Sequence, residues 1–334
     1  MFNWISARFS PGVLYLLYSL SLAGCSSTPQ TNALPEALPI TISHHVELSE
    51  VPFFPQKAYQ CGPAALATML SYRELAVTDK ELVSKVYLPQ RRGSVQIEMI
   101  ATARSYGMLA YPLEPNLKNI VQEVAAGNPV LVFQNLSLPF WPQWHYAVVV
   151  GYDLDEKRLI LRSGDIKRHD MSMATFERTW DRAKDWAYVI MKPGIIPVTA
   201  DAVKYVLANH DLEGSGFASE ALQGYRAAAA RWPDNSIVLM TLANSEQAAG
   251  HLTEAEKSYK REIELRPANA NAWNNLAYNL VSRKCILQAQ QAISCALRLN
   301  PADSNILQSF KEIQNLHSET HSVCELPACP LSDE

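Results

Sequence analysis

The sequence lacks the features that would link the chain to nucleic acid, metal ions or ATP. Its 29 Lys and Arg residues are outnumbered by 33 Asp and Glu, so a formal net charge of −4 gives no basic signature for a nucleic-acid partner. There is no CxxC pair or His-rich cluster to hold a metal, and no Walker A motif to bind ATP. We therefore expect no metal site and no cofactor. The short basic run Gln90-Arg91-Arg92-Gly93 predicts a solvated loop.

Long apolar runs are also scarce, and one lies at the N-terminus. Val13 to Leu22 follows Arg8 and is too short for a comfortable membrane-spanning helix, but it is typical of the core of a signal peptide. It leads into Ala23-Gly24-Cys25, which resembles a bacterial lipobox in which Cys25 becomes the lipid-modified first residue. The alternative is a plain secretory signal. By the same resemblance, Ser26 favours the outer membrane, with the protein on the periplasmic face.

At 334 residues, the chain is expected to hold two domains. We predict a signal peptide at 1–24 and a flexible tether at 25–46, because that segment is rich in Ser, Thr, Pro and Asn. Between 47 and 194, predicted helices come first and strands later. This order indicates an α+β domain with an antiparallel sheet.

The residues after Gly194 are predicted to be helical and to repeat every 34 positions. Three prolines and three alanines keep this interval: Pro233, Pro267 and Pro301, and Ala221, Ala255 and Ala289. The period and pattern resemble the tetratricopeptide repeat, a helical hairpin that packs on its neighbours. We expect an all-α repeat domain at 200–316 and a tail at 317–334. The first unit, from about Ala202, is expected to be degenerate, with the insertion-like segment Glu213-Gly214-Ser215-Gly216. Such repeats either bind a partner peptide or pack against the neighbouring domain.

Four cysteines lie in this C-terminal part of the chain. Export would permit disulfides, and Cys324 and Cys329 flank a short Pro-containing loop, which makes them candidates to pair with each other. Cys285 and Cys295 are expected to share one helix, about 15 Å apart at roughly 1.5 Å per residue. That separation excludes a bond between them.

One cysteine and one histidine occupy settings suited to catalysis. Cys61 lies in Gln60-Cys61-Gly62-Pro63, which predicts a sharp turn into a helix with Pro63 at the first helical position. A thiol at a helix N-terminus is acidified by the helix dipole and the free amides. His145 begins a predicted buried strand, where it can take the thiol proton. The pair is the skeleton of a cysteine peptidase; the alternative is a structural cysteine and a core histidine.

Three segments resemble the C39-like, papain-type cysteine peptidases, over roughly residues 48–192. They are Val51-Pro52-Phe53-Phe54-Pro55-Gln56, Cys61-Gly62-Pro63-Ala64-Ala65-Leu66 and His145-Tyr146-Ala147-Val148-Val149-Val150-Gly151-Tyr152-Asp153. The resemblance implies a papain-like fold, with Cys61 as nucleophile and His145 as general base and acid. It implies Gln56 as a side-chain donor to the oxyanion, and Gln60 is a second candidate. With the lipobox and the repeats, the whole chain resembles bacterial lipoproteins that join such a domain to tetratricopeptide repeats.

Two residues compete for the third catalytic role. A histidine base needs a partner that fixes its tautomer, and C39-like domains place an Asp, in an Asn-Asp-Pro setting, on the strand after the histidine strand. The matching stretch here is Arg162-Ser163-Gly164-Asp165. A hairpin turn centred near Asp155 would place His145 opposite Asp165, with Ser163 as a diagonal neighbour on the same face. Ser163 stands closer to the position of the family's Asp, and Asp165 supplies the expected carboxylate.

These features predict a cysteine peptidase that hydrolyses peptide bonds through a Cys61 acyl-enzyme, with repeats that bind a partner or the substrate. No transmembrane bundle accompanies the domain, so an exporter role is not supported. One alternative is the same thiol chemistry on another acyl donor, as in an acyltransferase or a peptidoglycan peptide hydrolase. The other is a catalytically inactive C39-like domain that acts with the repeats as a binding adaptor.

Overall fold

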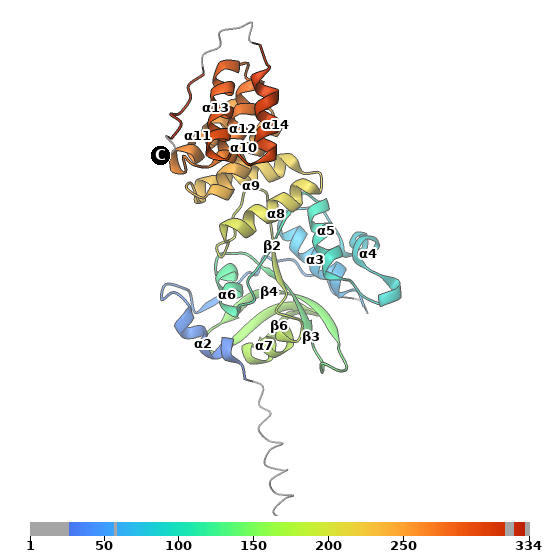
Figure 1. Ribbon diagram of the computed structural model, residues 1–334. Coiled ribbons are helices and arrows are strands. Elements are labelled where there is room, and N and C mark those ends of the chain that lie inside the picture. Colours follow the sequence, from blue (N-terminus) through green and yellow to red (C-terminus); the bar gives the residue numbers. More distant parts are fainter. Residues whose placement is uncertain (1–26, 57–58, 318–323, 331–334) are drawn as a thin grey trace, which may run out of the picture.

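The computed structural model describes residues 27–56, 59–317 and 324–330 (Figure 1). The predicted signal peptide at 1–24 and the predicted lipid-attachment residue Cys25 lie outside these residues. Among the helices of the described residues, none combines the length and apolar character that crossing a bilayer requires.

The N-terminal domain is an antiparallel sheet with helices on both faces, which confirms the α+β prediction. The strands lie in the order β2-β7-β3-β4-β5-β6, with β1 beside the end of β4. They are β1 (His45–Glu47), β2 (Leu109–Pro112), β3 (Val130–Asn135), β4 (Trp144–Asp153), β5 (Arg158–Ser163), β6 (Ile166–Ser172) and β7 (Ala187–Met191). The helices of this domain are α2 (Pro29–Ala37), α3 (Cys61–Tyr72), α4 (Asp79–Val86), the 3₁₀ turn η1 (Pro89–Arg91), α5 (Gln96–Ser105), α6 (Leu117–Ala125) and α7 (Met173–Asp181).

Strand β4 divides the core because successive side chains on a strand point to opposite faces. Tyr146 and Val148 belong to the buried cluster that holds the apolar side of α3. Ala147 and Val149 belong to a second cluster, with α6 and α7. The histidine strand therefore runs between two packed layers, and its first residues emerge at one end of the sheet.

The predicted flexible tether at 25–46 is wrong for its described part, because α2 packs on the domain. The buried Glu177 carboxylate accepts bonds from the Gln30 amide (2.9 Å), the Thr31 amide (2.8 Å) and the Thr31 hydroxyl (2.6 Å). Leu34 is buried in the same core as α6 and α7. The polar residues that suggest a solvated linker instead satisfy a buried charge.

The C-terminal domain is all helical and fits the predicted tetratricopeptide repeats. Its helices are α8 (Ala202–Gly214), α9 (Ala218–Arg231), α10 (Ser236–Ala248), α11 (Leu252–Leu265), α12 (Ala270–Ser282), α13 (Ile286–Leu299) and α14 (Ser304–Gln314). Helix starts recur every 34 residues from α8 onward. The predicted insertion at 213–216 is wrong: Gly216 takes the left-handed turn position, with φ of 94°, that Gly250 and Lys284 take in the next two repeats.

The first repeat packs directly onto the sheet, so the two domains share one core. Tyr205 of α8 and Tyr225 of α9 belong to the same buried cluster as Tyr111 of β2. The rings of Tyr111 and Tyr205 lie 6.5 Å apart, and the Asp201 amide donates to the Tyr111 hydroxyl at 2.9 Å. In Figure 1 the remaining repeats stack away from the sheet.

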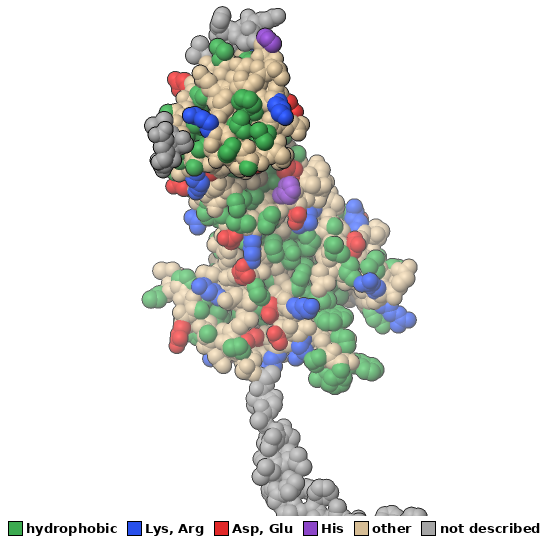
Figure 2. Space-filling model, viewed as in Figure 1, with side chains coloured by type: hydrophobic (Ala, Val, Ile, Leu, Met, Phe, Trp, Pro, Cys, Tyr) green, Lys and Arg blue, Asp and Glu red, His purple; other side chains and the backbone are tan. Residues whose placement is uncertain are grey.

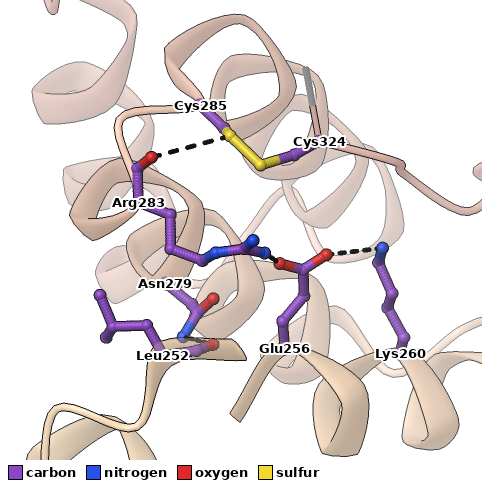
Figure 3. The surroundings of a disulfide bond; sticks show 7 residues. All are labelled: Leu252, Glu256, Lys260, Asn279, Arg283, Cys285 and Cys324. Atoms are coloured by element: carbon purple, nitrogen blue, oxygen red, sulfur yellow. Dashed lines mark hydrogen bonds and ion pairs between the residues drawn. A yellow bond between two sulfur atoms is a disulfide. The ribbon is translucent and has the colours of Figure 1, made fainter. Parts of the chain in front are cut away.

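Two disulfides join the C-terminal tail to Cys285, the N-cap of α13, and to Cys295 within that helix, and neither is the predicted Cys324–Cys329 bond. Cys285 pairs with Cys324, with a Cα–Cα distance of 6.0 Å (Figure 3). Cys295 pairs with Cys329, with a Cα–Cα distance of 5.8 Å. As predicted, Cys285 and Cys295 are not bonded to each other. An extended five-residue step in the tail covers about 17 Å, close to the length of about 15 Å of the ten-residue step in the helix, so each tail cysteine meets a different helix cysteine.

Candidate active site

Cys61 is the first residue of α3, and the start of this helix leaves its amide free. The first intrahelical bond runs from the Ala64 amide to the Gln60 carbonyl at 3.3 Å. Pro63 is therefore the third helical residue, not the first as predicted. Its missing N–H still costs nothing there, because the amides of the first turn have no partner within the helix.

Close packing against the α5 segment explains the glycine after the cysteine. A Cβ placed on Gly62 would lie 2.2 Å from the Ser94 hydroxyl oxygen and 2.5 Å from the Ser94 Cβ. The Met99 sulfur would lie at 3.2 Å. Gly62 thus lets the segment around Ser94 approach the cysteine turn.

Ser163, not Asp165, contacts the histidine. His145 Nε2 lies 2.8 Å from Ser163 Oγ. Strand β5 ends at Ser163, and Gly164, with φ of 61°, turns the chain so that Ser163 pairs with Ile166 of β6. Asp165 therefore sits exposed in the turn, and among the described residues it makes no side-chain hydrogen bond to His145.

The hairpin register explains why both residues looked possible from the sequence. Val148 pairs with Arg162, a register that would place His145 opposite Asp165 if the strands continued. A bulge between Val149 and Gly151 shifts the rest of the hairpin by one residue. The predicted register is thus correct at the end of the sheet that bears the site, but the ladder stops before it reaches Asp165.

Cys61, His145 and Gln56 line one cavity of about 870 Å³. The Gln56 amide donates to the Gly164 carbonyl at 3.0 Å, which ties this segment to the turn after Ser163. Gln60, the other predicted oxyanion donor, is the N-cap of α3 and is not among the residues that line the cavity. The described residues include no direct hydrogen bond between Cys61 and His145.

Burial keeps both members of the pair neutral. Burial raises the pKa of the Cys61 thiol, although the amides of Tyr146, Gly62 and Cys61 act to lower it. The expectation that the helix start acidifies this thiol is therefore wrong in this structure, because desolvation outweighs the amides. Burial, with a smaller contribution from His169, lowers the pKa of His145 to about 4. The resting cavity therefore holds a neutral thiol and an unprotonated imidazole.

Aromatic side chains form part of the cavity wall. Trp144 lines the cavity, is 51% exposed and stacks on Phe133 with ring centroids 5.2 Å apart. Phe140 and Trp141, in the loop between β3 and β4, are 80% and 76% exposed and do not line it. Hydrophobic side chains gather at this end of the molecule in Figure 2.

Sequence reasoning missed several cavity residues. Arg91 and Arg92, expected in a solvated loop, are exposed but also line the cavity, as do Ser94, Arg182 and Lys184. No local pattern marks them, because they reach the site only through the packing of η1 and of the turn after α7. Among the described residues, no group of three or more His, Cys, Asp or Glu is placed to hold a metal ion.

Comparison with known proteins agrees with this architecture. Residues 48–188 match the model of the Peptidase_C39 like family. Over these residues the chain is similar to the C39-like peptidase family, and the helices that follow fit tetratricopeptide repeats. Among curated proteins, no match to the chain was found.

Solved structures similar to the chain fall into the same two groups. A C39-like peptidase from Bacillus anthracis is 20% identical, with a TM-score of 0.37, over 44% of this chain and 98% of the other. The tetratricopeptide domain of Sgt2 from Aspergillus fumigatus is 18% identical, with a TM-score of 0.33, over 40% and 89%. The second such domain of human RPAP3, in complex with an HSP70 peptide, is 17% identical, with a TM-score of 0.32, over 34% and 96%.

Proposed function

We propose that this protein is a cysteine hydrolase that cleaves peptide bonds through a Cys61 acyl-enzyme. The observation that carries the proposal is the shared cavity of Cys61, His145 and Gln56, with His145 held by Ser163. The match of residues 48–188 to a peptidase family supports the same chemistry.

The proposed mechanism begins with the neutral pair. If Ser163 Oγ accepts the Nε2–H of His145, Nδ1 is left unprotonated and takes the Cys61 proton as the sulfur attacks the amide carbon. The Cys61 amide and the Gln56 side chain donate to the oxyanion, a type of contact worth about 3–4 kcal/mol in the transition state. The imidazolium then protonates the leaving amine. Water, deprotonated by His145, hydrolyses the thioester and regenerates the thiol.

The test is digestion of a peptide library by the purified protein, read by mass spectrometry. Wild-type protein is expected to produce discrete cleavages that Cys61→Ala and His145→Ala abolish. Asp165→Ala, which alters only the exposed turn, is the matched control and should keep the wild-type pattern. Cleavage by Cys61→Ala at the wild-type rate would remove this residue from the mechanism.

A binding adaptor is the second candidate, and two observations favour it. The described residues hold no direct Cys61–His145 hydrogen bond, and burial raises the pKa of the thiol. An adaptor would leave the library uncut while still capturing a partner through its repeats. The RPAP3 domain, solved with an HSP70 peptide, supports a peptide ligand for such helices.

We also propose that the mature protein is lipid-anchored through Cys25 on the periplasmic face of the bacterial outer membrane. The support is the sequence Leu22-Ala23-Gly24-Cys25 and the two C-terminal disulfides, since such bonds persist in oxidising compartments. Cys25→Ser should move the protein from the membrane fraction to the soluble fraction. Membrane retention of the variant would contradict the anchor.

A further inference from the structure

The charged side chains around the candidate active site all carry one sign. The cavity that holds Cys61 is lined by four cationic residues, Arg91, Arg92, Arg182 and Lys184. No Asp or Glu of the described residues lines it, although acidic residues outnumber basic ones in the chain as a whole. None of the four cations forms an ion pair with another described residue.

One wall of this cationic cavity is a tight, pinned turn. The Arg91 amide donates to the Leu88 carbonyl at 3.0 Å, and the Leu88 amide donates to the Gly93 carbonyl at 2.8 Å. Arg92 takes a left-handed conformation with φ of 47°. Ser94, two residues after Arg92, packs against Gly62, so the turn that displays the two arginines is fixed directly beside the cysteine turn.

The second wall is the turn after α7, and it is also held in place. Arg182 Nε and Nη2 donate to the Asn135 carbonyl at 3.2 and 3.1 Å. Lys184 has φ of 59°, and its amide donates to the Asp181 carbonyl at 2.8 Å. The nearest acidic side chains in sequence, Asp181 and Asp185, do not line the cavity.

We propose that the substrate bound at Cys61 is an anionic peptide segment whose carboxylates contact Arg91, Arg92 and Lys184. The proposal deepens the proposed function and rests on it for the identity of Cys61 as the attacking group. Arginine presents a rigid fork that matches a carboxylate. A cavity lined by one sign of charge concentrates ligands of the other sign. Because the cations stand on two walls, a segment with more than one carboxylate fits better than a single chain terminus.

The test measures binding to full-length Cys61→Ala, which cannot react. Three dye-labelled hexapeptides serve as probes in fluorescence anisotropy: one with two internal Glu and an amidated C-terminus, its Gln counterpart, and the Gln counterpart with a free C-terminal carboxylate. The Glu peptide should bind at least about tenfold tighter than the amidated Gln peptide in 50 mM salt. The preference should shrink in 500 mM salt, where the screening length falls to a few ångströms. Equal binding of the Glu peptide and the amidated Gln peptide would overturn the proposal.

Charge-removing variants locate the effect. Adding Arg91→Gln and Arg92→Gln to Cys61→Ala should remove most of the preference for Glu. Lys257→Gln, an exposed charge on α11, is the matched control and should leave the preference intact. An unchanged preference in a double-arginine variant with a native circular dichroism spectrum would contradict the assigned contacts. A free-carboxylate peptide that binds as tightly as the Glu peptide would overturn the internal acidic segment in favour of a chain terminus.

A second readout uses the native thiol and separates this proposal from the proposed function. Iodoacetate and iodoacetamide differ mainly in charge, so the ratio of their alkylation rates at Cys61 should exceed the same ratio for glutathione. The double variant Arg91→Gln, Arg92→Gln should lower this ratio of iodoacetate to iodoacetamide alkylation rates at Cys61. Selective binding of the Glu peptide without cleavage of any library peptide would contradict the proposed hydrolase and support the anionic ligand. Cleavage of library peptides with no preference for acidic ones would support the hydrolase and contradict the anionic ligand.

Discussion

At the level of single residues, Cys61 and His145 are both half-buried, and each is neutral in the resting protein. Desolvation raises the pKa of the thiol and lowers that of the imidazole to about 4. A base with this pKa is unprotonated throughout the neutral range, but its pKa lies well below the operating pH at which a general base works best, so transfer of the thiol proton to it is uphill. The Cys61 thiol must therefore lose its proton during the attack, whereas an acidified cysteine is already a thiolate before it attacks.

Removing the Ser163 hydroxyl should slow turnover without weakening substrate binding. A neutral hydrogen bond of this kind is worth about 1 kcal/mol, so Ser163→Ala should lower kcat by roughly five- to tenfold and leave KM nearly unchanged. Ser163→Asn, which keeps an acceptor, should restore most of the rate. Steady-state kinetics on a cleaved library peptide measures both constants. Full activity of Ser163→Ala, or a comparable loss in Asp165→Ala, would contradict this assignment.

Stability should depend on pH through His145. Its pKa of about 4 in the folded state lies below its ordinary value of 6.5, so between these values the unfolded state binds more protons. This contribution is present above pH 6.5 and is lost as pH falls towards 4, by about 3 kcal/mol in all. Asp185, whose pKa is raised to about 6 by burial and by Asp181 and Glu177, acts in the opposite direction in the same window.

Urea unfolding of wild type and His145→Gln isolates the histidine, because Asp185 contributes to both proteins. The difference in unfolding free energy should grow in favour of the variant as pH falls from 7 to 4. If the unfolding free energies of the two proteins changed in parallel with pH, His145 would have its ordinary pKa in the folded protein.

At the level of elements, the helix that begins at Cys61 depends on the α5 segment beside it. Gly62→Ala would push a methyl group into Ser94, and overpacking of this kind costs about 1–3 kcal/mol. Urea unfolding should show that loss, and adding Ser94→Gly should recover much of it. Gly93→Ala is the matched control, since a Cβ there meets its nearest atom at 3.8 Å. An equal loss in both single variants would contradict the packing argument.

Local patterns predicted these elements well, and their ends less well. A helix entered at the Cys61 turn and the strand of His145 follow from a Gly-Pro turn and an apolar run, both of which are local signals. The bulge near Val150 and the turn at Gly164 do not follow from local signals, because they depend on how three strands meet. That is why the sequence left Ser163 and Asp165 as alternatives.

At the level of the whole molecule, the first repeat completes the core of the N-terminal domain. Removal of residues 200–334 would uncover the part of the sheet that Tyr205 of α8 covers at Tyr111. The shortened chain should bind the dye ANS, unfold at lower temperature and associate in sedimentation experiments. A chain ending at Pro267, which keeps α8–α11, should retain the thermal transition of the N-terminal domain. A monomeric, dye-free 27–199 fragment would show that the repeats are not needed for that core.

The sequence by itself determined that a helix begins near Cys61, that His145 lies on a strand and that the C-terminal part repeats every 34 residues, because turn residues, apolar runs and periodicity are properties of neighbouring residues. Only the tertiary structure decided which residue holds His145, how Cys285, Cys295, Cys324 and Cys329 pair, and which cations line the cavity. It also decided the direction of the Cys61 pKa shift. Each of these depends on distances between segments far apart in the chain and on the water that their packing excludes.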